Sequence, residues 1–157
     1  MTGSLDPADR LALHDLVHRY AAAVDERDTD AVTSLFTADA TLVVPDPPGR
    51  LDAVVEHHGP AGVRAALATL DQFRRTVHEI TGIVIEPVDD VDGADGRIAG
   101  VAHHYLERTD GVIDLCWRLR YDDHYVRTAT GWRIARRTVT TLVVETSSAR
   151  QVLGHDS

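Results

Sequence analysis

The order of the secondary-structure patterns is the feature that most constrains the fold of this 157-residue chain. Apolar residues recur at helical spacing in the first part of the chain, whereas four long runs in the second part alternate with a period of two. Helices followed by consecutive antiparallel strands indicate an α+β fold, because the sheet can then bury one face against the helices. We therefore expect a curved, mixed or antiparallel sheet wrapped around three N-terminal helices.

Caps, prolines and glycines mark the expected boundaries of these elements. Asp6 has the position of an N-cap and Pro7 that of the first helical residue, so the first helix runs to about Asp25. Further helices are expected at 29–36 and from 59 to about 70, and strands at 40–44, 76–86, 97–108, 113–127 and 132–144. Loops or turns are expected at 45–49, 89–96, 110–111 and 129–131. Together they predict one domain over 1–157, with a core at about 8–146 and a polar, mobile tail after Ser147.

Composition and charge exclude several classes of function. The net charge of −9 argues against nucleic acid and anionic membranes as partners. The sequence has neither a signal-peptide pattern nor an apolar run near the ~20 residues of a membrane span. The single Cys116 suits a reducing environment, so we expect a cytoplasmic protein. The chain lacks lysine, a P-loop, a dinucleotide-binding motif and paired CxxC, which gives no support for Schiff-base chemistry, a nucleotide cofactor or a metal.

Asp25 is a carboxylate at the edge of the apolar side of the first helix. At about 100° per residue it lies roughly 140° around the helix from Tyr20 and about 80° from Val17, the nearest member of the apolar stripe. A carboxylate in such a place must be hydrogen-bonded, paired or in contact with a cavity, because an isolated buried charge is too costly. The alternative is a solvated carboxylate at the helix end, beside Glu26 and Asp28. The apolar stripe that defines this side of the helix comprises Leu13, Leu16, Val17, Tyr20 and Val24.

Five segments with recognisable motifs follow one another along the chain. They are a Tyr-x4-Asp helix, the sequences SLFTADA and GPAGVRAAL, a strand with TVHEITGI, and a final hairpin with RYDDHYVRTATGWRIARR. Their order resembles the SnoaL-like branch of the nuclear transport factor 2-like superfamily. The resemblance covers about Leu11 to Val144 and implies a cone-shaped α+β domain that encloses a cavity. The superfamily includes dehydratases, cyclases, isomerases, a dehydrochlorinase and non-catalytic binders, so the fold does not settle the function.

The same resemblance implies a set of candidate catalytic residues. In the dehydratase and dehydrochlorinase members, an Asp at the position of Asp25 pairs with a strand His at the position of His78 to form the catalytic base. Bile acid dehydratases also have a Tyr where Tyr20 stands and an Arg where Arg137 stands. Such a carboxylate can orient one imidazole nitrogen and leave the other free as a base. Taken alone, His78 would more often be a surface or satisfied core histidine.

Alternation along the later strands adds candidates for the cavity wall, because residues two apart share a face. Gly100, Ala102 and His104 share one face, and the small residues leave space for a ligand. His104 is therefore expected in the cavity and His103 on the opposite face, although one core and one surface histidine would fit as well. On the next strand Asp123 is expected to support Arg137 or to share the cavity face. The candidate substrate-binding residues are Phe36, Ala102, Trp117, Leu119 and Tyr121.

These features favour a cofactor-independent lyase, most like a dehydratase, acting on a small hydrophobic oxygenated substrate such as a polyketide or steroid-like ring. His78 would remove a proton next to a carbonyl, and Tyr20 would donate a hydrogen bond to the reacting oxygen. Arg137 would stabilise negative charge or hold Asp25, and His104 would protonate the leaving hydroxyl.

Two alternatives stay open, and the oligomeric state is a separate expectation. A polyketide cyclase or isomerase would use the same base without eliminating water, and a non-catalytic small-molecule binder or scaffold subunit would use the same cone. A homodimer or homotrimer is expected because the last strand is apolar on both faces, at Val139 and at 142–144.

Overall fold

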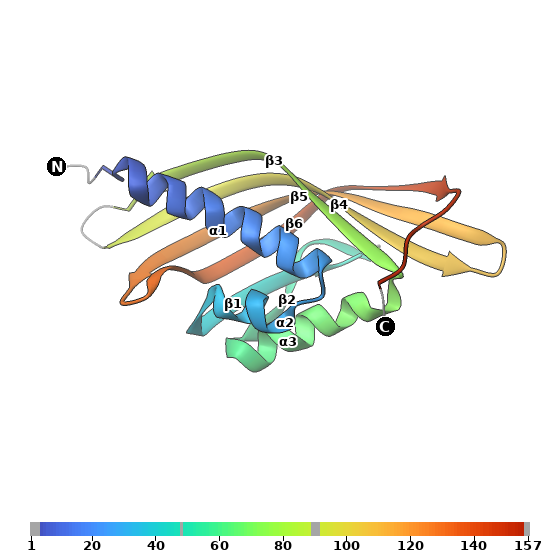
Figure 1. Ribbon diagram of the computed structural model, residues 1–157, viewed down its shortest axis with the longest axis horizontal. Coiled ribbons are helices and arrows are strands. Elements are labelled where there is room, and N and C mark those ends of the chain that lie inside the picture. Colours follow the sequence, from blue (N-terminus) through green and yellow to red (C-terminus); the bar gives the residue numbers. More distant parts are fainter. Residues whose placement is uncertain (1–3, 48, 89–91, 156–157) are drawn as a thin grey trace.

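The computed structural model describes residues 4–47, 49–88 and 92–155, and it confirms the α+β fold (Figure 1). The expected loop at Pro48 and part of the expected turn, at 89–91, lie outside the described residues. The helical elements are α1 (Pro7–Asp25), α2 (Thr29–Ser34), α3 (Gly59–Ala68) and the short 3₁₀ helix η1 (Thr69–Gln72). The strands are β1 (Phe36–Asp46), β2 (Arg50–His58), β3 (Arg75–Pro87), β4 (Gly93–Arg108), β5 (Gly111–Thr128) and β6 (Gly131–Ala149).

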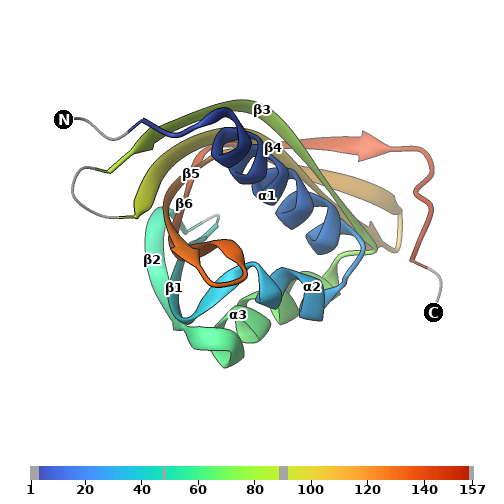
Figure 2. The ribbon, with the colours of Figure 1, turned by 60° about the vertical axis from the view of Figure 1, so that its left-hand side comes forward.

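The six strands form one sheet in the order β2-β1-β6-β5-β4-β3. β1 and β6 are parallel, and every other neighbouring pair in this sheet is antiparallel. The sheet curves around α1, which lies on its concave side, while α2 and α3 lie below the open end of the curve (Figure 2). The mixed sheet wrapped around three helices is therefore confirmed.

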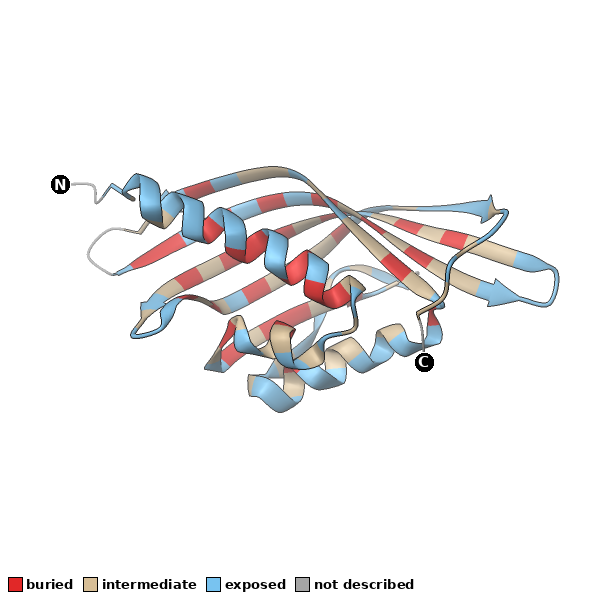
Figure 3. Ribbon diagram, in the orientation of Figure 1, coloured by how far each residue is buried: buried red, intermediate tan, exposed pale blue. Residues whose placement is uncertain are grey.

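The caps of the first two helices form as the sequence predicts. The Asp6 carboxylate accepts a hydrogen bond of 2.8 Å from the backbone N–H of Asp9, and Pro7 occupies the first helical position. The Asp28 carboxylate does the same for α2, accepting from Ala31 at 2.9 Å. One face of α1 is buried against the sheet and the other is exposed (Figure 3). No helix in the described part of the chain is long and apolar enough to cross a membrane.

The prediction for residues 36–58 is wrong in two respects. Phe36 begins β1 rather than ending the second helix, so that β1 is longer than the expected strand at 40–44. The segment Arg50–His58, to which the sequence pattern assigned neither helix nor strand, is strand β2. β2 lies at the edge of the sheet and most of its side chains are exposed. Such a strand needs little apolar alternation, and its sequence pattern is correspondingly weak.

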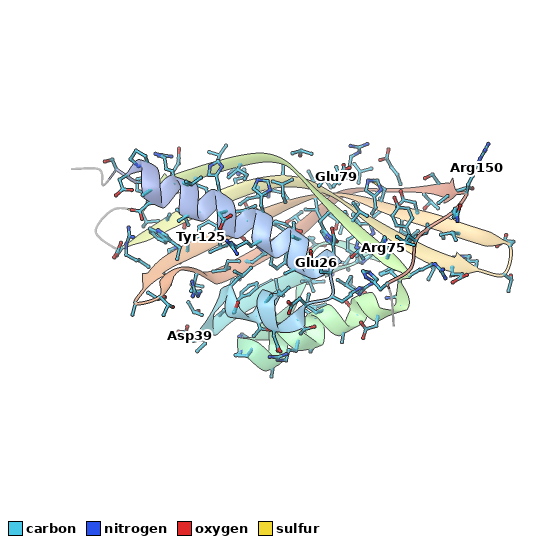
Figure 4. All side chains as sticks on the ribbon, viewed as in Figure 1. Glu26, Asp39, Arg75, Glu79, Tyr125 and Arg150 are labelled. Carbon is cyan, nitrogen blue, oxygen red and sulfur yellow. The ribbon has the colours of Figure 1, made fainter. Side chains whose placement is uncertain are left out.

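The C-terminal residues return along the start of β3. β6 continues to Ala149, two residues past the expected beginning of the tail. The Arg74 Nε donates to the carbonyl oxygen of Val152 at 3.2 Å, and the Arg75 Nη2 donates to that of Gly154 at 3.0 Å. Arg75 is labelled beside this segment in Figure 4. The structure thus places the tail against β3, and its mobility stays a prediction.

Candidate active site

The last residue of α1 meets the edge strand β3 at a pair of ionisable side chains. The Asp25 Oδ1 lies 2.6 Å from the His78 Nδ1, so the contact expected from the sequence is present. The other carboxylate oxygen accepts the backbone N–H of His78 at 2.7 Å, and the Thr76 hydroxyl donates to Oδ1 at 3.0 Å. The side chains are 22% exposed for Asp25 and 9% for His78. The carboxylate is therefore partly buried and fully engaged, rather than solvated at the helix end.

These hydrogen bonds define the protonation state of the pair. Burial raises the pKa of Asp25, but the hydrogen bonds from His78 and Thr76 outweigh it and hold the pKa below its ordinary value. An ionised carboxylate only accepts hydrogen bonds, so His78 carries its proton on Nδ1. Its Nε2 has no protein partner within the described residues, and in the neutral form of the ring this atom carries the free lone pair. This is the tautomer that a general base requires.

A small cavity of about 110 Å³ lies next to His78, between α1, η1 and the concave face of the sheet. Tyr20 and Val24 of α1 form one wall, and the end of α3 with η1 forms another. The sheet supplies His78 from β3, with neighbours from β1, β4, β5 and β6. The predicted site residues that line this cavity are Tyr20, His78, Ala102, His104, Trp117, Leu119 and Tyr121.

Three predicted residues lie outside the lining of this cavity. Asp25 contacts the cavity only indirectly, through its hydrogen bond with the His78 imidazole. Phe36 was predicted to bind the substrate, and this prediction is wrong. It is buried in the hydrophobic core, where its ring meets that of Tyr20 edge to face with 6.1 Å between the centroids. Phe36 begins β1 and reaches the core from there, whereas the sequence pattern had placed it at the end of the second helix. The third, Arg137, belongs to a separate buried cluster.

His104 is inside the cavity as expected, but its protonation differs from the predicted role. Its side chain is buried at 1% exposure, and its Nδ1 lies 3.0 Å from the carbonyl oxygen of Leu115 on β5. Because a carbonyl only accepts, Nδ1 carries the proton and Nε2 is an acceptor. Burial lowers the pKa of His104 to about 4, against the opposing effect of the Leu115 carbonyl. A neutral His104 cannot act as the resting proton donor that the sequence suggested.

The rings around His104 fix its position in the cavity. Its centroid lies 4.2 Å from that of Trp117 and 4.9 Å from that of Phe73. The His78 ring is 6.0 Å away at an interplanar angle of 80°. Both imidazoles line the same cavity, so a group bound there lies near both.

The low pKa of His104 predicts a component of acid instability. The unfolded chain binds the proton at the ordinary pKa of 6.5, while the folded protein binds it only near pH 4. Stability is therefore lost as the pH falls from about 6.5 to about 4, by roughly 3 kcal/mol for this group. Urea unfolding of the wild type and of His104→Phe between pH 4 and 8 measures it. We expect the variant to lose less stability on acidification, and parallel curves would contradict the buried neutral state.

Arg137 forms a buried cluster with Asp123. The guanidinium donates from Nε to Oδ1 at 2.8 Å and from Nη2 to Oδ2 at 2.6 Å, with no exposed surface on either side chain. Tyr125, labelled in Figure 4, donates its hydroxyl hydrogen to the same carboxylate at 2.5 Å. Burial alone would lower the pKa of Arg137, but the Asp123 carboxylate raises it well above its ordinary value. The predicted support by Asp123 is confirmed, and the alternative that Arg137 holds Asp25 is wrong.

The Arg137 cluster supports the cavity wall from behind. The guanidinium carbon lies 4.0 Å from the ring centroid of Tyr20 and 4.2 Å from that of Tyr121. The two tyrosine rings meet edge to face at 5.9 Å. Burial raises the pKa of Tyr20, although Arg137 opposes the effect, so its hydroxyl stays protonated and can donate at neutral pH. Arg137 thus packs against a tyrosine that lines the cavity.

A curved sheet around a helix, with a histidine–carboxylate pair beside a small cavity, defines a cone-shaped domain suited to small molecules. The chain belongs to the SnoaL-like domain family, whose match covers residues 7–138. Its fold is that of the nuclear transport factor 2-like superfamily.

Solved structures share this fold over nearly the whole chain. One from Novosphingobium aromaticivorans, provisionally described as an aromatic ring hydroxylase, is 27% identical with a TM-score of 0.76 and covers 93% of this chain and 96% of its own. A second from the same organism, provisionally described as a scytalone dehydratase, is 20% identical with a TM-score of 0.71, over 94% and 91%. The hexachlorocyclohexane dehydrochlorinase LinA-type3 of Novosphingobium barchaimii is 19% identical with a TM-score of 0.76, over 93% and 95%. The last two likenesses show the fold alone.

Proposed function

We propose that the protein is a lyase that needs no cofactor and eliminates water from a small hydrophobic oxygenated substrate. The observation that carries the proposal is that His78 lines the cavity with its Nδ1 bonded to Asp25 and its Nε2 without a partner among the described residues. A neutral imidazole with an ionised carboxylate behind it is a general base whose conjugate acid is stabilised. The names of two structural neighbours, a dehydratase and a dehydrochlorinase, both denote eliminations and support this reaction class.

The site can carry out the elimination with a single proton carrier. The His78 Nε2 takes a proton from the carbon next to a carbonyl, and the electron pair of that C–H bond becomes the new C=C bond as the C–O bond breaks. Tyr20 donates a hydrogen bond to the carbonyl oxygen while negative charge develops there. The leaving hydroxyl donates to the His104 Nε2, and its oxygen receives the proton from the His78 imidazolium. Water leaves and His78 returns to its neutral state, so His104 acts as an acceptor throughout.

A substrate screen tests this proposal directly. Hydroxylated cyclic and polycyclic ketones are incubated with the protein in D₂O, and the reaction is followed by ultraviolet absorbance and proton NMR. We expect the absorbance of a conjugated enone to appear while the NMR signal of the proton on the hydroxyl-bearing carbon disappears. Deuterium uptake or a shifted double bond without loss of the hydroxyl would instead identify an isomerase. Saturable binding with neither change would identify a binding protein, and both outcomes contradict the lyase proposal.

A further inference from the structure

The cavity beside His78 adjoins a second, larger space. This second space measures about 680 Å³ and lies against the start of β5 and the later part of β6. The two chambers share part of their lining and therefore lie side by side. The shared residues are Val44, Pro45, Ala66, Thr69, Leu70 and Trp117. We call the second space the antechamber and the cavity beside His78 the inner chamber.

The inner chamber has room for at most one small ring. An apolar cavity of roughly 150 Å³ accommodates a benzene molecule, and the inner chamber measures only about 110 Å³. Trp117 lies against His104 at 4.2 Å between ring centroids and lines both chambers. An extension of the reacting ring that is directed past Trp117 would enter the antechamber.

The antechamber is suited to an uncharged apolar group. Most of its lining is aliphatic or aromatic, including Leu115, Phe73 and Val144. Its charged residues have opposite signs, Asp46 and Arg108, so the lining has no excess of positive charge to hold an anion. The net charge of −9 on the whole chain further disfavours an anionic extension.

We propose that the substrate is an oxygenated ring bearing an uncharged apolar extension, a further ring or an alkyl chain, and that the antechamber selects this extension. The proposal rests on the proposed function for the reaction of the ring. The binding of the extension can be measured without that reaction. Each methylene buried in the antechamber is expected to tighten binding by roughly fourfold, as for transfer of a methylene out of water. The trend ends when the chain reaches the solvent.

Adjacent valines on β6 provide a matched pair of variants. Val144 lines the antechamber and lies opposite Trp117 in the sheet. Val143 lies opposite Arg118 and is 44% exposed. A charge introduced at Val144 should oppose an apolar extension, whereas the same charge at Val143 should meet solvent on the other face.

The test is calorimetric titration of the wild type, Val144→Asp and Val143→Asp with cyclohexanone and its 4-methyl, 4-propyl and 4-pentyl derivatives. We expect affinity to rise along the series in the wild type and in Val143→Asp. Val144→Asp should bind cyclohexanone within about twofold of the wild type and gain little from the longer chains. An affinity that does not change with chain length in the wild type, or the same trend in both variants, would overturn the proposal.

A charged probe separates the two parts of the inference. Adding a terminal carboxylate to the pentyl derivative should weaken binding to the wild type, and tighter binding would show that the antechamber takes an acid through Arg108. The chain-length trend does not depend on catalysis. The trend without elimination in the substrate screen would uphold the antechamber and reject the lyase, and elimination without the trend would do the reverse.

Discussion

Replacing His78 with alanine is expected to lower kcat/KM by a factor of about 10² to 10⁴, the usual contribution of a general base. Asp25→Asn should lower it by a comparable factor, because asparagine keeps the shape but loses the charge that stabilises the imidazolium. Steady-state kinetics on a substrate from the screen measures both. The rising limb of the pH profile should belong to the coupled Asp25–His78 pair rather than to either residue alone.

A second histidine–carboxylate pair on the opposite face of the sheet supplies the control. The His103 Nδ1 lies 2.7 Å from the Asp114 Oδ2, nearly the same geometry as the pair beside the cavity. His103 does not line the cavity, so His103→Ala should keep nearly full activity. Full activity in both His78→Ala and Asp25→Asn would end the lyase proposal and leave a binding function in its place.

Replacing Arg137 with methionine is expected to destabilise the fold by about 3 to 5 kcal/mol, because it leaves the Asp123 carboxylate buried without its cation. Asp123 has no exposed side-chain surface, so water cannot replace the guanidinium without local opening. Urea denaturation at pH 7 measures the free energy of unfolding. Activity should fall as well, since the Tyr20 ring loses the guanidinium that lies 4.0 Å from its centroid.

A triple variant distinguishes a lost ion pair from lost packing. Arg137→Met combined with Asp123→Leu and Tyr125→Phe removes all the polar members of the cluster together. We expect it to regain most of the lost stability, because an apolar set of similar volume often matches a buried ion pair. Stability of Arg137→Met equal to that of the wild type would show that Asp123 finds another partner. A triple variant no more stable than the single one would assign the loss to packing.

The sequence predicts best those features that depend on neighbouring positions along one element. The apolar stripe of α1 places Asp25 at the edge of the buried face, and the cap at Asp6 follows from the local sequence. The contact between Asp25 and His78 joins residues far apart in the chain and came from the resemblance to a family. Alternation correctly placed His104 and Trp117 in the cavity, because the faces of a strand repeat every second residue.

Features set by the register between strands could not be predicted in this way. The tautomer of His104 depends on the carbonyl of Leu115, its partner across β4 and β5, which no local pattern specifies. The Asp123–Arg137 pairing depends on the register of β5 and β6, and the sequence left two roles open for each residue. Strand β2 was not predicted, because an exposed edge strand has little apolar periodicity. Phe36 was assigned to the second helix for a different reason, because the helical spacing of Ala31, Val32 and Leu35 continues to it although it already begins β1.

The bond between the Asp25 carboxylate and the backbone of His78 has a consequence for association between molecules. β3 is the last strand of the sheet, and the N–H groups of such a strand can pair with a strand of another chain. Asp25 occupies one of these N–H groups at 2.7 Å. An asparagine can still accept this hydrogen bond through its amide oxygen, but an alanine cannot. Asp25→Ala therefore opens a site for intermolecular strand pairing beside the imidazole, and concentration-dependent aggregation would accompany its loss of activity.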